Sequence, residues 1–377
     1  AMREKATGTS STNREKIKFG NIGRFSFIML LLSCLLVLAL VLNVNIGSVS
    51  IAIQDVFQMI WSSIRYGIAN IFTRGGYAEE LNAVINSSTE SQILFRIRIP
   101  RMLLAAILGG ALSVSGYLLQ VFFRNPIAGP FVLGISSGAK MVVGITLIFL
   151  TQYIGSISSL TLILAAFLGS LLITFIVLLF SQKVRNMSML LVIGIMVGYI
   201  CGAATDFCIT FADDHDVVNL TNWSMGTFSG ASWDNVQTAM LMCIPGILAA
   251  LLLSKPISAY ALGEGYAQSM GIRIKPFRIL LILLSSLLSA CVTALAGPIS
   301  FVGIAVPHIT RTLLKSSKPV FVIPSTFLCG AVFCVFCDLI ARTVFAPTEL
   351  AIGTVTSVFG APVVIYMMVK RRRTQED

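Results

Sequence analysis

Charged residues are scarce in this sequence, and acidic ones are the scarcest. Only 11% of the 377 residues are charged, with 16 acidic against 27 basic side chains, whereas soluble domains carry about 25%. This composition excludes an ordinary soluble protein. The net charge of +11 does not indicate a nucleic-acid partner, because the basic residues stand in short segments between apolar runs.

Groups that support catalysis or metal binding are also few. His215 and His308 are the only histidines, and they stand too far apart in the sequence to predict a metal site. Cys334 and Cys337 form a C-x-x-C pair within an apolar stretch, which we interpret as small-residue packing rather than a redox or metal site. The sequence offers no nucleophile–base pair. We expect no catalysis, no metal site and no cofactor bound by this chain.

A nucleotide-binding loop is missing as well. Residues 129–141, "GPFVLGISSGAKM", look like a phosphate loop, but Ala139 separates Gly138 from Lys140 and Met141 stands where a hydroxyl is needed. A phosphate loop requires the lysine directly after its second glycine. We interpret the stretch as small residues that allow close helix packing in a membrane.

What the sequence has in abundance is long apolar runs, such as residues 158–180, "SSLTLILAAFLGSLLITFIVLLF". Runs of about 20 apolar residues predict transmembrane helices. The expected fold is therefore an all-α polytopic membrane protein, with a transmembrane domain over 24–370 between basic cytoplasmic tails at 1–23 and 371–377. The ten expected spans are 24–46, 99–121, 135–152, 157–181, 188–211, 235–254, 276–296, 301–315, 320–344 and 350–369.

The distribution of basic residues predicts the orientation. Both terminal segments are basic, and most of the 27 basic residues fall in segments that would share their side. Because positive loops mark the cytoplasm, both termini are expected inside. The polar segment 47–98 would then lie outside, with a solvated loop at 75–92, and the segment 254–276 would lie inside.

Two blocks of the sequence resemble each other. Residues 98–126 and 278–308 each combine a basic start, a small-residue-rich helix and a break that contains proline. Each is followed by a short apolar run and two longer ones. Spans 2–5 and 7–10 are therefore predicted to form inverted-topology repeats, which frame a pathway in many transporters.

Residues 261–272, "ALGEGYAQSMGI", are the most informative short stretch. Their glycines predict two short helical turns that could dock on another protein. The stretch resembles the coupling loop of the iron-siderophore, haem and cobalamin permeases of bacterial ABC importers. The match rests on the following residues: Ala261, Leu262, Gly263, Glu264, Ala267 and Gly271, with Met270 in place of a leucine.

Further blocks resemble the same family in the same order over about residues 25–370. They are "RIPRMLLAAILGGALSVSGYLLQ" (98–120), "FRNPIAGPFVLGISSGA" (123–139), "WSMGTFSGASW" (223–233), "AGPISFVGIAVPHITR" (296–311) and "CDLIARTVFAPTELAIGTVTSVFGAP" (337–362). The resemblance implies a permease subunit without enzymatic activity. ATP and magnesium would be bound by two cytoplasmic ATPase subunits that receive the coupling loop.

The resemblance also implies partners and site residues. The pathway would lie between two copies of this chain, or between the chain and a paralogue. Exposed arginines at Arg98, Arg101 and Arg342 would meet carboxylates of an external solute-binding protein, as charge complementarity favours; the alternative is arginines at the headgroup level. Inner gates would lie at Asn125 and Ile127 and at Met187 and Ser188, which can also be read as turn and capping residues.

The sequence departs from the family at two notable positions. Gly129 replaces an acid, which puts the details of the gate in doubt. Lys140 replaces a small apolar residue, so it either attracts an anionic chelate in the pathway or, as we favour, extends its amine to the inner membrane surface.

The implied cargo is a ferric siderophore first, then haem, then cobalamin, carried across a bacterial cell membrane. Two rivals remain from the residues alone. An ion-coupled secondary transporter would need carboxylates within its spans, for which Asp206 and Asp338 are the nearest cases. A receptor without transport would leave the coupling loop without a task.

Overall fold

The computed structural model describes residues 2–47, 53–72, 78–150, 158–184 and 187–376. Helices make up nearly all of this part of the chain, and it contains no strand. The helices are α1 (Met2–Asn45), α2 (Ile53–Phe72), α3 (Ala78–Ile85), α4 (Thr89–Ile93), α5 (Ile99–Phe123), α6 (Ile135–Ile145), α8 (Ser159–Lys183), α9 (Met187–Ile209), α10 (Asp214–Ser224), α11 (Trp233–Leu252), α12 (Ser254–Leu262), α13 (Glu264–Ser269), α14 (Ile274–Ala296), α15 (Val302–Leu314), α16 (Pro319–Thr343) and α17 (Ile352–Glu376), with π-helical turns η1 (Leu94–Arg98) and η2 (Thr146–Leu150).

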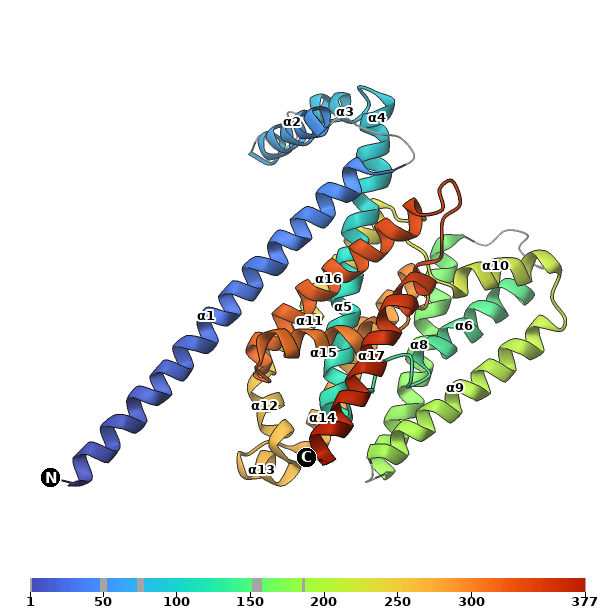
Figure 1. The fold of residues 1–377 in the computed structure, drawn as a ribbon. Coiled ribbons are helices and arrows are strands. Elements are labelled where there is room, and N and C mark those ends of the chain that lie inside the picture. Colours follow the sequence, from blue (N-terminus) through green and yellow to red (C-terminus); the bar gives the residue numbers. More distant parts are fainter. Residues whose placement is uncertain (1, 48–52, 73–77, 151–157, 185–186, 377) are drawn as a thin grey trace.

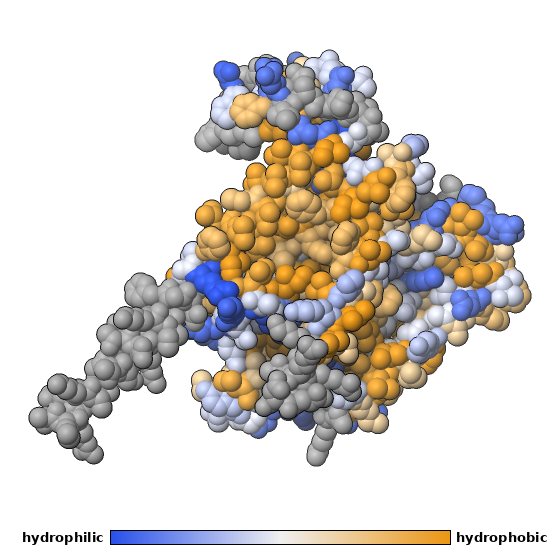
Figure 2. Space-filling model, viewed as in Figure 1, coloured by the Kyte–Doolittle hydropathy of each residue, from blue (hydrophilic) through white to orange (hydrophobic). Residues whose placement is uncertain are grey.

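The membrane architecture predicted from hydropathy is confirmed. Within the described residues, eight helices are long and apolar enough to cross a membrane, and two shorter apolar helices lie at 135–150 and 302–314. Together they correspond to the ten runs expected from the sequence. Figure 2 shows the result as a broad hydrophobic surface across the middle of the molecule, with hydrophilic residues towards both ends.

The central helix of the bundle is α5, whose side chains are almost all buried. It follows η1 without a break, with Pro100 in its first turn, and ends at Arg124 in a left-handed conformation (φ 48°). Its small residues let other helices approach closely. A Cβ at Gly109 would lie 2.6 Å from the carbonyl oxygen of Gly330 on α16.

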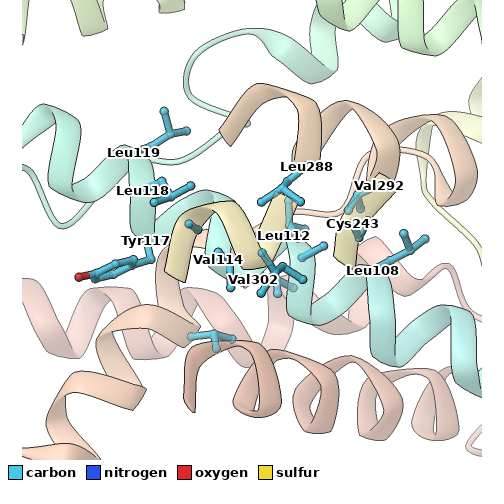
Figure 3. Packing of buried hydrophobic residues seen from close by; sticks show 14 of the residues in the cluster. Leu108, Leu112, Val114, Tyr117, Leu118, Leu119, Cys243, Leu288, Val292 and Val302 are labelled. Carbon is cyan, nitrogen blue, oxygen red and sulfur yellow. The ribbon is translucent and has the colours of Figure 1, made fainter. Parts of the chain in front are cut away.

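Around α5 the core is continuous. Figure 3 shows Leu112 of α5 among Leu288 and Val292 of α14, Cys243 of α11 and Val302 of α15. Within α16, Cys334 and Cys337 are both buried, and Cys334 packs against Gly109. The C-x-x-C pair therefore contributes to helix packing.

Each of the two predicted repeats packs its first helix against a helix of the other repeat. Helices α5, α6, α8 and α9 correspond in order to α14, α15, α16 and α17. The first helix of one set packs on the third helix of the other, so α5 contacts α16 and α14 contacts α8. Where α5 crosses α14, the Ser115 and Ser285 hydroxyls each donate to the other residue's carbonyl oxygen, at 2.8 and 3.0 Å. This reciprocal arrangement is what an inverted repeat produces.

The stretch 129–141 packs as the sequence predicts. Gly134 adopts φ 75° immediately before α6, and Gly138 sits against α8, where an added Cβ would lie 2.2 Å from the Ile173 side chain and 2.7 Å from the Gly169 carbonyl oxygen. The glycines serve a turn and a close helix contact.

One expectation about the polar segments is wrong. Residues 75–92 do not form a solvated loop over their described part, because α3 and α4 occupy most of it. The Ser88 side chain accepts from the Ser91 N–H and caps α4. Figure 1 shows α2, α3 and α4 gathered as a cap at one end of the molecule, while α12 and α13 lie at the opposite end.

Candidate functional site

The predicted coupling loop forms two short helices joined at a glycine. Helix α12 ends at Leu262, Gly263 takes φ 139° and ψ 150°, and α13 starts at Glu264. This backbone conformation is open almost only to glycine. A second glycine, Gly271 (φ 82°), turns the chain towards α14. The two-helix shape expected from the glycines is confirmed.

The surface of this element suits a protein partner. Ala267 is fully buried and anchors α13, while Ala261, Leu262 and Met270 are exposed. The exposed fractions of Leu262 and Met270 are 71% and 63%. Large exposed apolar side chains at the tip of a polar loop mark an interaction surface.

Tyr260 links the coupling element to the central helix. Its side chain is fully buried, and its hydroxyl donates to the Glu264 carboxylate at 3.2 Å. Arg124, at the end of α5, donates to the Tyr260 carbonyl oxygen at 3.2 Å and lies 5.0 Å from the centre of its ring. A displacement of α12 and α13 would therefore act on the end of α5 through the contacts between Tyr260 and Arg124.

Burial determines the protonation of Tyr260. Removal from water, reinforced by the neighbouring Glu264 carboxylate, raises the pKa of Tyr260 to about 12. The phenol therefore keeps its proton, and with it the ability to donate to Glu264, further into the alkaline range than an exposed tyrosine does.

A cavity of about 720 Å³ lies between the coupling element and the bundle. Its lining includes the predicted gate residue Asn125, the coupling residues Ala261 and Leu262, and the polar side chains of Tyr117, Gln120, Arg124, His308 and Arg311. Arg311 donates to the Gln120 side-chain oxygen, which joins α15 to α5. The structure therefore brings Asn125 and the coupling residues to one cavity.

The predicted gate residues lie in a turn and at the end of a helix. The Asn125 side chain accepts from the Ile127 N–H at 3.1 Å, which closes a turn after α5. Met187 is the first residue of α9, although its side chain lies outside the described part of the structure, and Ser188 beside it is exposed. Lys140 is half-buried on α6. A gating role for these residues remains a prediction.

The departure at Gly129 has a packing consequence. A Cβ at this position would lie 2.8 Å from the Ile304 side chain. An acid at position 129 would therefore require Ile304 to move.

At the opposite end of α5, Arg101 is held by two carboxylates. Its Nε and Nη2 atoms donate to Asp338 of α16 at 3.1 and 2.9 Å, and its Nη1 donates to Glu349 at 3.0 Å. The side chains of Arg101 and Asp338 are 9% and 1% exposed, against 44% for Glu349. The guanidinium and Asp338 are thus buried, and of the three side chains Glu349 is the exposed one.

Arg98 and Arg342 both donate hydrogen bonds to residues at the end of α1. Arg98 donates to the Val44 carbonyl oxygen, and Arg342 donates to the carbonyl and the side-chain oxygen of Asn43. A Cβ at Gly47 would lie 2.7 Å from the Arg98 guanidinium. The three arginines predicted as a docking set therefore lie together, and we call them the arginine cluster.

The expectation that Arg98 and Arg101 are exposed is wrong, since the two residues are only 5% and 8% exposed. The sequence did not reveal their acceptors, which come from distant parts of the chain. A usable signal was Asp338 itself, a single carboxylate in an apolar helix four residues before Arg342. Asp206, the other intramembrane candidate, is exposed on α9.

A bundle of apolar spans with paired halves, a two-helix element at one end and an arginine cluster at the other is the architecture of a membrane permease. Residues 35–370 match the FecCD transport family, and the chain belongs to that family. It is therefore a permease subunit of an ABC importer and not itself an enzyme, since a partner ATPase hydrolyses the ATP.

Individual relatives agree with this assignment. The chain is 37% identical to the vitamin B12 import system permease BtuC of Vibrio cholerae over 285 residues, covering 75% of this chain and 85% of that protein. It is 33% identical to the hemin transport system permease HmuU of Yersinia pestis over 310 residues, covering 81% and 92%. A solved metal-chelate type ABC transporter in an inward-facing conformation matches with a TM-score of 0.76 at 26% identity, covering 92% and 99%.

Proposed function

We propose that this permease imports an iron(III)–siderophore complex across the bacterial cell membrane. The cargoes named for its relatives, vitamin B12 and hemin, and the metal-chelate type of the similar structure support a large metal chelate as the substrate class. A ferric siderophore belongs to that class. Haem and cobalamin are the second candidates, because the relatives carry them.

In the proposed assembly, partners bind at both ends of the helix bundle. Two permease copies, or this chain with a paralogue, enclose the pathway, and two ATPase subunits receive the α12–α13 elements. A solute-binding protein docks at the arginine cluster. The observation that carries this proposal is the direct linkage from α13 through Tyr260 and Arg124 to α5, whose other end bears Arg101.

The orientation follows from charge. The coupling end faces the cytoplasm together with both termini, which the basic segments at 1–23 and 371–377 support. The arginine cluster and the cap α2–α4 then face outwards.

Uptake by intact cells tests the cargo. Cells with and without the gene receive radiolabelled iron as a hydroxamate or catecholate complex, and excess haem or cobalamin serves as competitor. We expect deletion to abolish uptake of one iron complex, with no effect of either competitor. Unchanged iron uptake together with lost haem or cobalamin uptake would reassign the cargo and leave the importer class in place.

A further inference from the structure

Helix α2 carries two large aromatic side chains on its surface. Phe57 and Trp61 are 68% and 63% exposed, and their rings stack with centroids 6.3 Å apart. Large apolar side chains exposed together indicate a contact with lipid or with another molecule, so this aromatic pair suggests a partner.

Another face of α2 is fixed to the bundle. Val56 is 7% exposed and packs, together with Met59 and Ile60, in a cluster that contains Val44 of α1 and Met102 of α5. The partners of α2 in this cluster lie near the end of α1, in the turn η1, in the first turn of α5 and at Ile85 of α3. Helix α2 therefore lies over the ends of the spans and does not run along their sides, which agrees with its place in the cap (Figure 1).

The side chains divide α2 into three strips. Successive residues are rotated by about 100° around a helix, so Phe57 and Trp61 lie beside the strip of Val56 and Ile60 that packs on the bundle. Exposed polar residues, Gln54, Gln58 and Arg65, follow on the far side of the aromatic pair. A packed strip, an aromatic strip and a polar strip are what a helix lying at a membrane surface requires.

The adjoining surface identifies the partner. Val37, Leu38 and Val41 of α1, and Ile46 directly after its last residue, are between 44% and 59% exposed, so apolar side chains continue to the end of the helix. In a membrane permease this surface faces lipid. The aromatic strip of α2 lies beyond the same end, so it continues the lipid-facing surface at the depth where tryptophan is enriched, the boundary between chains and headgroups.

We propose that Phe57 and Trp61 insert into the headgroup region of the leaflet beside the end of α1 and hold α2 on the bilayer surface. Their partner is lipid and not the solute-binding protein. The cap would then be a membrane anchor that fixes the outer ends of α1 and α5, next to the arginine cluster.

Tryptophan quenching in bilayers tests this proposal. The permease with its ATPase subunits is placed in phosphatidylcholine bilayers whose bromine atoms lie either near the headgroups or near the chain ends. The Trp61 signal is the difference between the wild type and Trp61→Phe, which keeps an aromatic ring and leaves Trp223 and Trp233 unchanged. We expect shallow bromines to quench this signal about twofold more than deep ones, with little quenching by aqueous iodide.

Two results would overturn the proposal. One is a Trp61 signal that iodide quenches in bilayers as strongly as in detergent, without any effect of brominated lipid. The other is shielding from iodide that develops only when the solute-binding protein is added. Neither result depends on which chelate the permease carries.

Discussion

Arg101 and Asp338 form a buried ion pair between α5 and α16; they stand 237 positions apart in the sequence, and the Arg101 Nη2 lies 2.9 Å from an Asp338 carboxylate oxygen. The pair joins a helix of the first repeat to a helix of the second. It lies beside the surface at which docking is proposed. Its burial makes it a structural element as well as part of the arginine cluster.

Asp338→Asn should destabilise the permease by about 3 kcal/mol, because it leaves a buried guanidinium with only Glu349 as a charged partner. Glu349→Gln is the matched control. Its carboxylate is 44% exposed, so its loss should cost less than about 1 kcal/mol. Unfolding midpoints of the two variants in the same detergent provide the comparison. Equal shifts would show that burial of the pair does not matter.

Gly263→Ala should impair coupling, while Gly265→Ala should not. Both glycines face open space, but only Gly263 has a positive φ, at 139°. Alanine there costs about 1–3 kcal/mol of backbone strain, so hydrolysis of ATP stimulated by the binding protein should fall about fivefold or more. Full stimulation in Gly263→Ala would refute a role for the α12–α13 geometry in coupling.

Tyr260 predicts a pH dependence of stability. The pKa of this phenol is raised from 10.0 to about 12, so the folded state retains the proton more strongly than the unfolded state does. The resulting stabilisation is complete below pH 10 and is lost as the pH rises towards about 12. The difference in unfolding midpoint between wild type and Tyr260→Phe should therefore shrink over this range. A constant difference would contradict the assignment.

Gly138→Ala should destabilise the contact between α6 and α8. The added Cβ would lie 2.2 Å from Ile173 and 2.7 Å from a backbone oxygen, and overpacking of this kind costs about 1–3 kcal/mol. Gly23→Ala on α1 is the control, since no atom lies within 4 Å of its added Cβ. The thermal midpoints of both purified variants test this, and a shift for Gly23→Ala alone would contradict the packing.

Hydropathy predicted the spans because a membrane helix carries its signal in its own residues, as residues 158–180 do for α8. The two turns of the coupling loop were predictable for the same reason, since Gly263 and Gly271 mark them locally. The burial of Arg101 was not, because its acceptors Asp338 and Glu349 come from remote segments. The prediction of a solvated loop at residues 75–92 was wrong because α3 and α4 are short helices with polar residues such as those found in loops.

The most direct test of the account is transport by the reconstituted complex. The permease, its ATPase subunits and the solute-binding protein loaded with a radiolabelled ferric siderophore are combined in proteoliposomes without an ion gradient. The account predicts accumulation of label that requires ATP and is lost in Gly263→Ala but retained in Gly265→Ala. In parallel proteoliposomes that have a proton or sodium gradient but no ATP, accumulation of label would contradict the account and would identify a secondary transporter instead.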